Sequence, residues 1–332
     1  MPGGLRSPIM PAPPGHSGAN RFGTYGGSLT MMKNRQVCIL GGTGFVGHHL
    51  VIALSAAGFQ CRVPTRHPQR HRDLNLVSGC TLHPVDGWDE EALSGALAGC
   101  GALINLVGIL NEQGGRTFEQ AHVKLVETAL RAAEHSGVRR YLHMSALNAN
   151  AEQGPSDYLR TKGRGEALAH AAASRGIAVT SFQPSVIFGR GDSFFNRFGG
   201  LLRTLPGPFP LACPNARFAP VFVGDVARAM VHCLESHSTA GKTFELCGPR
   251  TFTLRQLVEY TGAHIGRKVR VVGLSDGLSR LQARVFQHLP GKPFSMDNYL
   301  SLQVESVCGR NGLSELGIRA TDIDAVVPGY LK

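Results

Sequence analysis

Residues 37–47 read Val-Cys-Ile-Leu-Gly-Gly-Thr-Gly-Phe-Val-Gly, and this stretch decides the fold. The apolar run at 37–40 predicts a buried strand, and a helical pattern begins directly after the glycines. The spacing Gly-x-x-Gly-x-x-Gly differs by one residue from Gly-x-Gly-x-x-Gly, but it serves the same purpose. Small residues allow a tight turn and a close approach to a pyrophosphate, which the free N–H groups of a helix N-terminus bind. The residues expected to bind a dinucleotide are Gly41, Thr43, Gly44, Phe45, Val46 and Gly47, and the alternative is a glycine-rich turn without a ligand.

Apolar runs and helical periodicity then alternate along the chain, a pattern typical of βαβ units and a parallel sheet. The predicted strands are Gln36–Leu40, Gln60–Thr65, Thr81–Val85, Ala102–Val107, Arg140–Met144 and Ala178–Gln183, followed later by Phe218–Val223 and Thr243–Cys247. The predicted helices are Phe45–Ala57, Asp89–Ala98, Phe118–Ser136, Asp157–Arg175 and Leu254–His264, with a further helix capped by Asp225. We therefore expect an α/β fold with a Rossmann-type doubly wound sheet.

The rhythm weakens after Pro184, which predicts a division of the chain. We expect a dinucleotide-binding domain over residues 34–184 and a smaller, partly interleaved substrate region over 185–332. Residues 1–33 are rich in proline and glycine, so we predict a disordered extension there.

Composition limits the class of protein. With 42% hydrophobic and 17% charged residues in 332, the chain is globular, and Lys+Arg exceeds Asp+Glu by 34 − 23 = 11. Anionic partners are favoured, and a phosphorylated cofactor is one; the absence of a DNA- or RNA-binding motif argues against nucleic acid. The eight cysteines lack zinc or redox spacing, so we interpret them as small buried hydrophobes in a reducing compartment rather than a disulfide scaffold. The scattered histidines predict no metal site.

The loop after the second predicted strand indicates which cofactor is preferred. Folds of this kind that bind NAD place an acid there, whereas this chain has Arg66, Arg70 and Arg72 and no acid before Asp73. Since arginine binds a 2′-phosphate, we expect NADP(H) over NAD(H), with Arg66 as the main contact. The alternative is a solvated basic loop.

Other strand ends should meet the cofactor at the same edge of the sheet. Asp86 follows the third strand, where it either accepts a hydrogen bond from adenine or forms a turn. Val107 and Gly108 stand at the end of the fourth strand, and the small Gly108 would let a cofactor pass. Pro184 directly follows the sixth strand and belongs to the same predicted set.

Ser145, Tyr158 and Lys162 form the predicted catalytic set. Tyr158 and Lys162 are four residues apart and share one face of a helix, and Ser145 ends the preceding strand. A nearby ammonium lowers the pKa of a phenol and prepares it for proton transfer, while the serine polarises the substrate oxygen. The same lysine is expected to bind the nicotinamide ribose. A Tyr-x-x-x-Lys pair alone occurs often as a surface pair, and the preceding glycine loop together with the serine at the strand end favours the functional interpretation.

Together these motifs resemble the short-chain dehydrogenase/reductase superfamily, in its extended branch of the epimerase/dehydratase type. Residues 147–150, 158–162, 187–194 and 315–318 further resemble the family of the NADPH-binding accessory subunit of respiratory complex I and its bacterial relatives. The resemblance spans about residues 34–325. It implies a Rossmann sheet, tightly bound NADPH, and partners in respiratory or quinone-synthesis complexes.

The resemblance leaves two functions open. One is an NADP(H)-dependent oxidoreductase, and the other is a non-catalytic structural or assembly subunit that retains NADPH. The predicted location is the cytoplasm, with a peripheral place on the inner face of the cytoplasmic membrane, or the matrix side of the mitochondrion in a eukaryote.

The C-terminal region offers two further candidates. Arg190, Asn196 and Arg197 are predicted to line a substrate lid. Within 278–289 a basic amphipathic helix is expected, with Leu278, Leu281, Val285, Phe286 and Leu289 at helical spacing. Packing on the sheet is the favoured interpretation, and contact with a membrane or a partner is the alternative.

Overall fold

The computed structural model describes residues 34–205, 207–290 and 292–331. The predicted extension at residues 1–33 therefore lies outside the described residues. Within these ranges a parallel sheet of seven strands runs in the order β11-β6-β5-β4-β1-β2-β3, the doubly wound arrangement that the sequence predicts. The strands are β1 (Gln36–Leu40), β2 (Gln60–Thr65), β3 (Cys80–Pro84), β4 (Ala102–Asn105), β5 (Arg140–Met144), β6 (Ala178–Pro184) and β11 (Thr243–Leu246).

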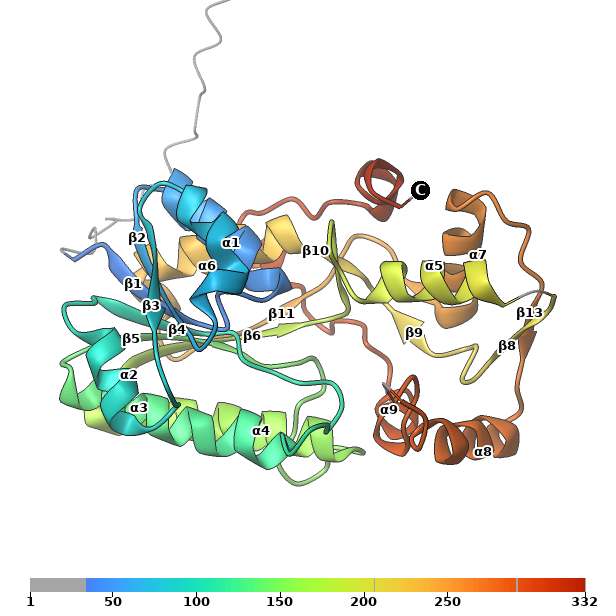
Figure 1. Ribbon diagram of the computed structural model, residues 1–332, viewed down its shortest axis with the longest axis horizontal. Coiled ribbons are helices and arrows are strands. Elements are labelled where there is room, and N and C mark those ends of the chain that lie inside the picture. Colours follow the sequence, from blue (N-terminus) through green and yellow to red (C-terminus); the bar gives the residue numbers. More distant parts are fainter. Residues whose placement is uncertain (1–33, 206, 291, 332) are drawn as a thin grey trace, which may run out of the picture.

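Helices cover both faces of this sheet (Figure 1). Helices α1 (Phe45–Ala56) and α6 (Val223–Glu235) pack together on one face. The other face carries α2 (Glu90–Leu97), α3 (Leu125–His135) and α4 (Asp157–Ala171). Each layer has its own apolar core, which is why the central strands are apolar on both faces.

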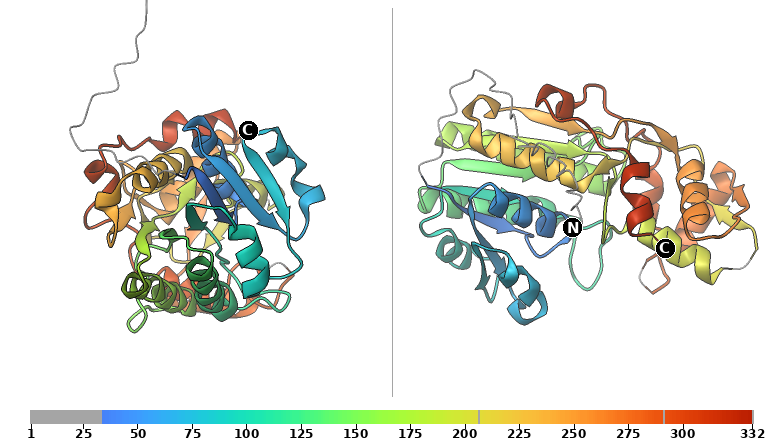
Figure 2. Two further views of the ribbon diagram at one scale, coloured as in Figure 1. Left: turned by 90° about the vertical axis from the view of Figure 1, so that its left-hand side faces the viewer. Right: turned by 90° about the horizontal axis from the view of Figure 1, so that it is seen from above.

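A smaller lobe extends from the carboxyl edge of the sheet, as Figure 1 and the right view of Figure 2 show. It contains α5 (Phe194–Thr204), α7 (Leu254–His264), α8 (Asp276–Phe286) and α9 (Met296–Ser301), whereas α10 (Gly312–Glu315) packs against β11 of the large sheet. Three short strand pairs join these helices: β7 (Ile187–Phe188) with β10 (Val221–Phe222), β8 (Phe209–Leu211) with β13 (Val271–Gly273), and β9 (Arg217–Phe218) with β12 (Phe252–Thr253). Because β11 and α6 return to the large sheet, residues after 184 contribute to both lobes.

Some predicted boundaries are wrong for identifiable reasons. Strand β4 stops at Asn105, because the Asn105 side chain accepts the N–H of Val107 and turns the backbone out of the ladder. The predicted strand Phe218–Val223 is two separate strands, β9 and β10, and Pro220 between them has no N–H to continue a ladder.

Asp225 does not cap α6, because Phe222 occupies the N-cap position. The Asp225 carboxylate is fully buried and accepts hydrogen bonds from the N–H and hydroxyl of Thr321 and from Arg228. Asp225 therefore attaches the C-terminal segment, through Thr321, to α6.

The cysteines also correct the prediction. Six are free, and all of these except the half-buried Cys213 are buried. Cys247, directly after β11, and Cys308 form a disulfide across 61 residues. The two meet because the chain between α9 and α10 returns to the end of the sheet. Among the described residues, no helix has the length and hydropathy required to cross a bilayer.

The apolar stripe on α8 does not pack on the sheet. Leu278, Leu281 and Val285 are exposed, and the buried residues of this helix are Ser279 and Ala283. The interpretation favoured by the sequence is therefore wrong.

His143 lies in the middle of the sheet, on β5. It is buried, and neither ring nitrogen has a hydrogen-bond partner among the described residues. Burial, with smaller contributions from the charges of Lys162 and His170, lowers the pKa of His143 to about 3. The unfolded chain has an ordinary histidine pKa near 6.5 and so binds more protons below that pH.

His143 should therefore make the fold sensitive to acid. Stability is fully present above about pH 6.5 and falls by about 1.4 kcal/mol per pH unit as the pH drops towards 3. We expect His143→Leu to reduce this slope, measured by urea unfolding between about pH 5 and 7.5. His232→Leu, at an exposed position on α6, is the control. Equal slopes in wild type and His143→Leu would contradict this assignment.

Candidate functional site

The glycine loop joins the end of β1 to the start of α1. Gly41 has φ +76°, and a Cβ there would lie 3.2 Å from the backbone of Leu106 and Val107. At Gly47 a Cβ would overlap the carbonyl groups of Gly41 and Gly42, with the Gly41 oxygen only 2.5 Å away. Glycine at these positions allows the N-terminus of α1 to pack closely against the end of β1.

The N-terminus of α1 is free to receive an anion. No side chain caps it, and its first turn holds no acid. Gly44, at the N-cap, is exposed, while the predicted contacts Thr43, Phe45 and Val46 are half-buried around it. The uncapped N–H groups and the positive end of the helix dipole therefore fit a pyrophosphate.

Arg66 and Asp86 stand side by side at the same edge of the sheet. The register of β2 with β3 pairs Thr65 with Pro84, and Val85 donates its N–H to the Thr65 carbonyl. Both Arg66 and Asp86 are exposed. The Arg66 guanidinium lies 5.9 Å from the ring of Trp88. The acid that follows in the sequence, Asp73, is paired with His48 at 2.7 Å.

The Lys162 side chain reaches the ends of β4 and β5, and Ser145 directly follows β5. The buried Lys162 ammonium donates to the carbonyls of Met144 at 2.9 Å and Val107 at 3.4 Å. A Cβ on Gly108 would lie 3.0 Å from this nitrogen. Ser145 is buried, and its hydroxyl has no partner among the described residues. A buried hydroxyl without a partner, one residue from a carbonyl that accepts an ammonium, fits a site that receives a polar ligand.

Burial sets the protonation of the predicted catalytic pair. It lowers the pKa of Lys162 to about 8. Burial, reinforced by the nearby Asp297 carboxylate, raises the pKa of Tyr158 to about 12. Burial and the Asp297 charge therefore shift the tyrosine pKa in the direction opposite to the one that the sequence predicts.

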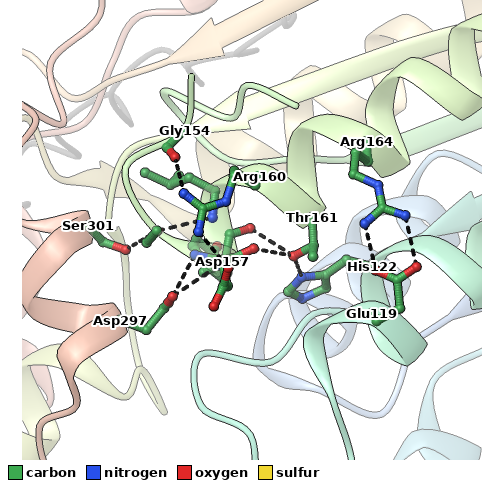
Figure 3. Close-up of polar contacts among 12 residues, drawn as sticks. Glu119, His122, Gly154, Asp157, Arg160, Thr161, Arg164, Asp297 and Ser301 are labelled. Carbon is green, nitrogen blue, oxygen red and sulfur yellow. Dashed lines mark hydrogen bonds and ion pairs between the residues drawn. The ribbon is translucent and has the colours of Figure 1, made fainter. Parts of the chain in front are cut away.

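Two side chains of α9 hold the start of α4, as Figure 3 shows. Asp297, on α9, accepts the backbone N–H groups of Asp157 at 2.7 Å and of Tyr158 at 3.3 Å. Ser301 donates to the N-cap residue Ser156 at 2.8 Å. The C-terminal lobe thus positions the helix that carries Tyr158 and Lys162.

His122 is a site residue that sequence analysis did not find. Its Nε2 accepts the N–H of Ile109 at 3.1 Å, so its Nδ1 carries the proton and donates to Thr161 on α4 at 3.0 Å. Figure 3 shows this second contact. Burial, with the charge of Lys162, lowers the pKa of His122 to about 2, so the ring stays neutral. The ring of Tyr158 contacts it edge-on at 5.5 Å.

Local backbone geometry brings His122 there. It lies in η2 (Gln120–Lys124), a π-helical turn that opens the predicted helix Phe118–Ser136 before α3. A Cβ on Gly165 would collide with the His122 carbonyl, so glycine allows α4 to approach this turn. Such turns are frequent at functional sites, but the sequence carries no signal for one.

The remaining predicted residues lie around this edge. Pro184 ends β6, and its carbonyl accepts the N–H of Leu147. Arg190 is exposed, and its carbonyl lies 3.3 Å from the His49 ring on α1. Asn196 donates to the Asp192 carbonyl and Arg197 to the Pro293 carbonyl, so both brace the lobe's own backbone. A cavity of about 480 Å³ elsewhere in this lobe is lined by Cys213, Arg217, Asp276 and Gln303, among others, and includes none of the predicted catalytic residues.

Comparisons with known proteins confirm the family resemblance. Residues 37–247 match the NAD dependent epimerase/dehydratase family. The chain is 30% identical over 308 residues to NADH dehydrogenase (ubiquinone) 1 alpha subcomplex subunit 9, mitochondrial, of Arabidopsis thaliana, covering 89% of this chain and 74% of the relative. It is 30% identical over 200 residues to a ceramide reductase of Caulobacter vibrioides, covering 59% of each. Among solved structures, an NADPH-dependent quinone oxidoreductase of Escherichia coli superimposes with a TM-score of 0.70 at 21% identity, covering 89% of this chain and 99% of the other.

Two glycines of the loop should respond differently to alanine. Gly47→Ala forces a Cβ into the backbone of the loop, which we expect to lower stability by about 1–3 kcal/mol and abolish dinucleotide binding. Gly44→Ala meets only the Gly41 oxygen, at 3.3 Å, so the fold should survive while the new methyl group obstructs the ligand. Thermal unfolding and calorimetric titration with NADPH measure both effects. Unchanged NADPH affinity in Gly44→Ala would mean that the loop is only a turn.

Proposed function

The chain belongs to the NAD-dependent epimerase/dehydratase family, and we propose that it is an NADP(H)-dependent reductase of a carbonyl or quinone substrate. The observation that carries this proposal is the buried hydroxyl of Ser145, which has no partner among the described residues and follows the strand end whose last carbonyl, that of Met144, accepts the Lys162 ammonium. A hydroxyl left unpaired inside a protein is costly unless a ligand satisfies it.

Each residue has a separate role in the proposed reaction. NADPH supplies the hydride. Tyr158 donates the proton to the substrate oxygen, and Ser145 donates a hydrogen bond to that oxygen while negative charge develops on it. Lys162 binds the ribose hydroxyls and, with a pKa lowered to about 8, is protonated at neutral pH. A bound ribose would draw this ammonium from the strand carbonyls towards the tyrosine and favour its phenolate.

The names of two similar proteins support a reduction. One relative is a ceramide reductase, and one solved structure is an NADPH-dependent quinone oxidoreductase. Two features of this chain support a preference for NADP(H). Arg66 is exposed at the edge of the sheet, where it could bind a 2′-phosphate, and Asp73, the nearest following acid, is paired with His48 and not free to bind a ribose.

A second candidate is a non-catalytic subunit of a respiratory or quinone-synthesis complex. It is favoured by similarity to a complex I subunit over 89% of the chain. The high pKa of Tyr158 also suits a cofactor site without turnover. Here bound NADPH would stabilise the fold by linkage, and the protein would sit at the inner face of the bacterial membrane or on the matrix side.

The exchange of bound nucleotide separates the two candidates. Nucleotide is extracted from the purified protein and identified, and its replacement by labelled NADPH is timed. Exchange within about a minute fits a reductase with ordinary turnover, and retention for hours fits the subunit. Absence of nucleotide together with no NADPH binding would overturn both.

Tyr158→Phe tests the proposed proton transfer. We expect kcat for substrate reduction to fall by about 10²- to 10⁴-fold while NADPH affinity is kept. Ser145→Ala should also lower kcat. The matched control is Ser181→Ala, which removes another buried hydroxyl without a partner among the described residues. Retained turnover in Tyr158→Phe would exclude the assigned role.

Arg66→Asp tests the cofactor preference. Loss of a charge-assisted contact with the 2′-phosphate should weaken NADPH binding by about 10- to 100-fold and leave NADH binding nearly unchanged. Arg70→Asp, at the next exposed arginine, controls for the general charge of the loop. Titration of each variant with both cofactors gives the ratio. An equal loss for NADPH and NADH, or no loss, would contradict the assignment.

A further inference from the structure

Helix α8 exposes its large aliphatic side chains and buries small ones, the reverse of what is usual for a surface helix in water. Its buried residues are the small Ser279 and Ala283. Its large aliphatic residues point outwards, with Leu278 53%, Leu281 56% and Val285 52% exposed, and Leu289 follows just after the helix. These residues are three or four apart and form one continuous apolar stripe, which we call the α8 face.

The charges around the α8 face have one predominant sign. Residues 276–292 contain Arg280, Arg284, His288 and Lys292 but only one acid, Asp276. The Asp276 carboxylate already has partners, because it accepts a hydrogen bond from Tyr299 and lies 3.9 Å from the Arg280 guanidinium. Arg284 is exposed and makes no ion pair within the described part of the chain. Exposed aliphatic side chains bordered by cations complement a surface that is apolar beneath and anionic above.

We propose that the α8 face docks on an anionic lipid bilayer. Leu278, Leu281, Val285 and Leu289 enter the boundary between headgroups and acyl chains, and Arg284 meets a lipid phosphate. A lipid surface fits better than a protein groove, because the α8 face is a simple aliphatic stripe without exposed aromatic anchors. The chain's net charge of +11 adds long-range attraction to the same surface.

The docked helix is connected to the candidate site. Helix α8 packs against α9, which holds the start of α4 through Asp297 and Ser301, as described above. Asn298, also on α9, donates to the carbonyl of Leu110, whose side chain is itself 56% exposed. Leu110 belongs to the loop that continues from Gly108. Figure 1 shows α8, α9 and α4 on the same side of the molecule. If the proposed function holds, docking places the catalytic helix next to the membrane and favours a substrate dissolved in it.

Co-sedimentation of the full chain with vesicles tests the docking and does not depend on catalysis. One set of vesicles is phosphatidylcholine, and the other contains phosphatidylglycerol. We expect about tenfold or stronger binding to the anionic vesicles, weakened by salt. Leu281→Asp/Val285→Asp should lower vesicle affinity by at least about tenfold, and Arg284→Glu should reduce only the preference for anionic lipid.

Leu76→Asp, at an aliphatic side chain that is 88% exposed at the end of η1 (Pro68–Leu76), is the matched control and should bind like wild type. Thermal unfolding confirms that each variant is folded. The proposal is overturned by no vesicle binding, by equal binding to both vesicle types, or by binding that Leu281→Asp/Val285→Asp leaves intact. It is also overturned if light scattering shows a dimer that this double variant dissociates, since a second copy would then cover the face.

Discussion

The close approach of α1 to the end of β1 is the constraint on which the site depends. Gly47 brings the helix start against the carbonyls of Gly41 and Gly42, where any side chain would collide with backbone. Because β1 lies between β2 and β4, the place of its end also fixes the loops that follow those strands. Arg66 and Val107 therefore gather around an uncapped helix N-terminus, and a pyrophosphate can be bound by backbone groups that need no reorganisation.

The second constraint is the packing of α4. Gly163 allows the helix to touch the backbone of residues 150–151, and Gly165 allows contact with the π-helical turn at His122. This approach buries Lys162 and half-buries Tyr158, and the loss of water around each group shifts its pKa against its charged form. Without a ligand the site thus holds an ammonium satisfied only by carbonyls and a phenol far from ionisation. A ligand with hydroxyls and charge would change both the hydrogen bonds of the ammonium and the pKa of the phenol. The chemistry of this site therefore depends on the cofactor as much as on the side chains.

Local sequence patterns predicted most of the strands and helices. The features that the sequence did not predict depend on contacts between residues far apart in the chain. Apolar runs near glycine predicted the bounds of β1, β2 and β5 to the residue, because the hydrophobicity of a strand's own residues indicates that it is buried. His122 escaped notice because its role depends on a backbone N–H and a threonine from other segments. The disulfide between Cys247 and Cys308 joins residues that only the finished fold brings together.

Helix α8 shows the same limit in a different form. Periodicity predicts an amphipathic helix, but it does not say which side the protein covers. Helix α8 packs against α9, its buried residues are the small Ser279 and Ala283, and the larger aliphatic side chains lie outside. Since α9 also holds the first N–H groups of α4 through Asp297, the exposed face and the candidate catalytic helix belong to one connected unit. A surface that covers this face would therefore also restrict the helix that carries Tyr158 and Lys162.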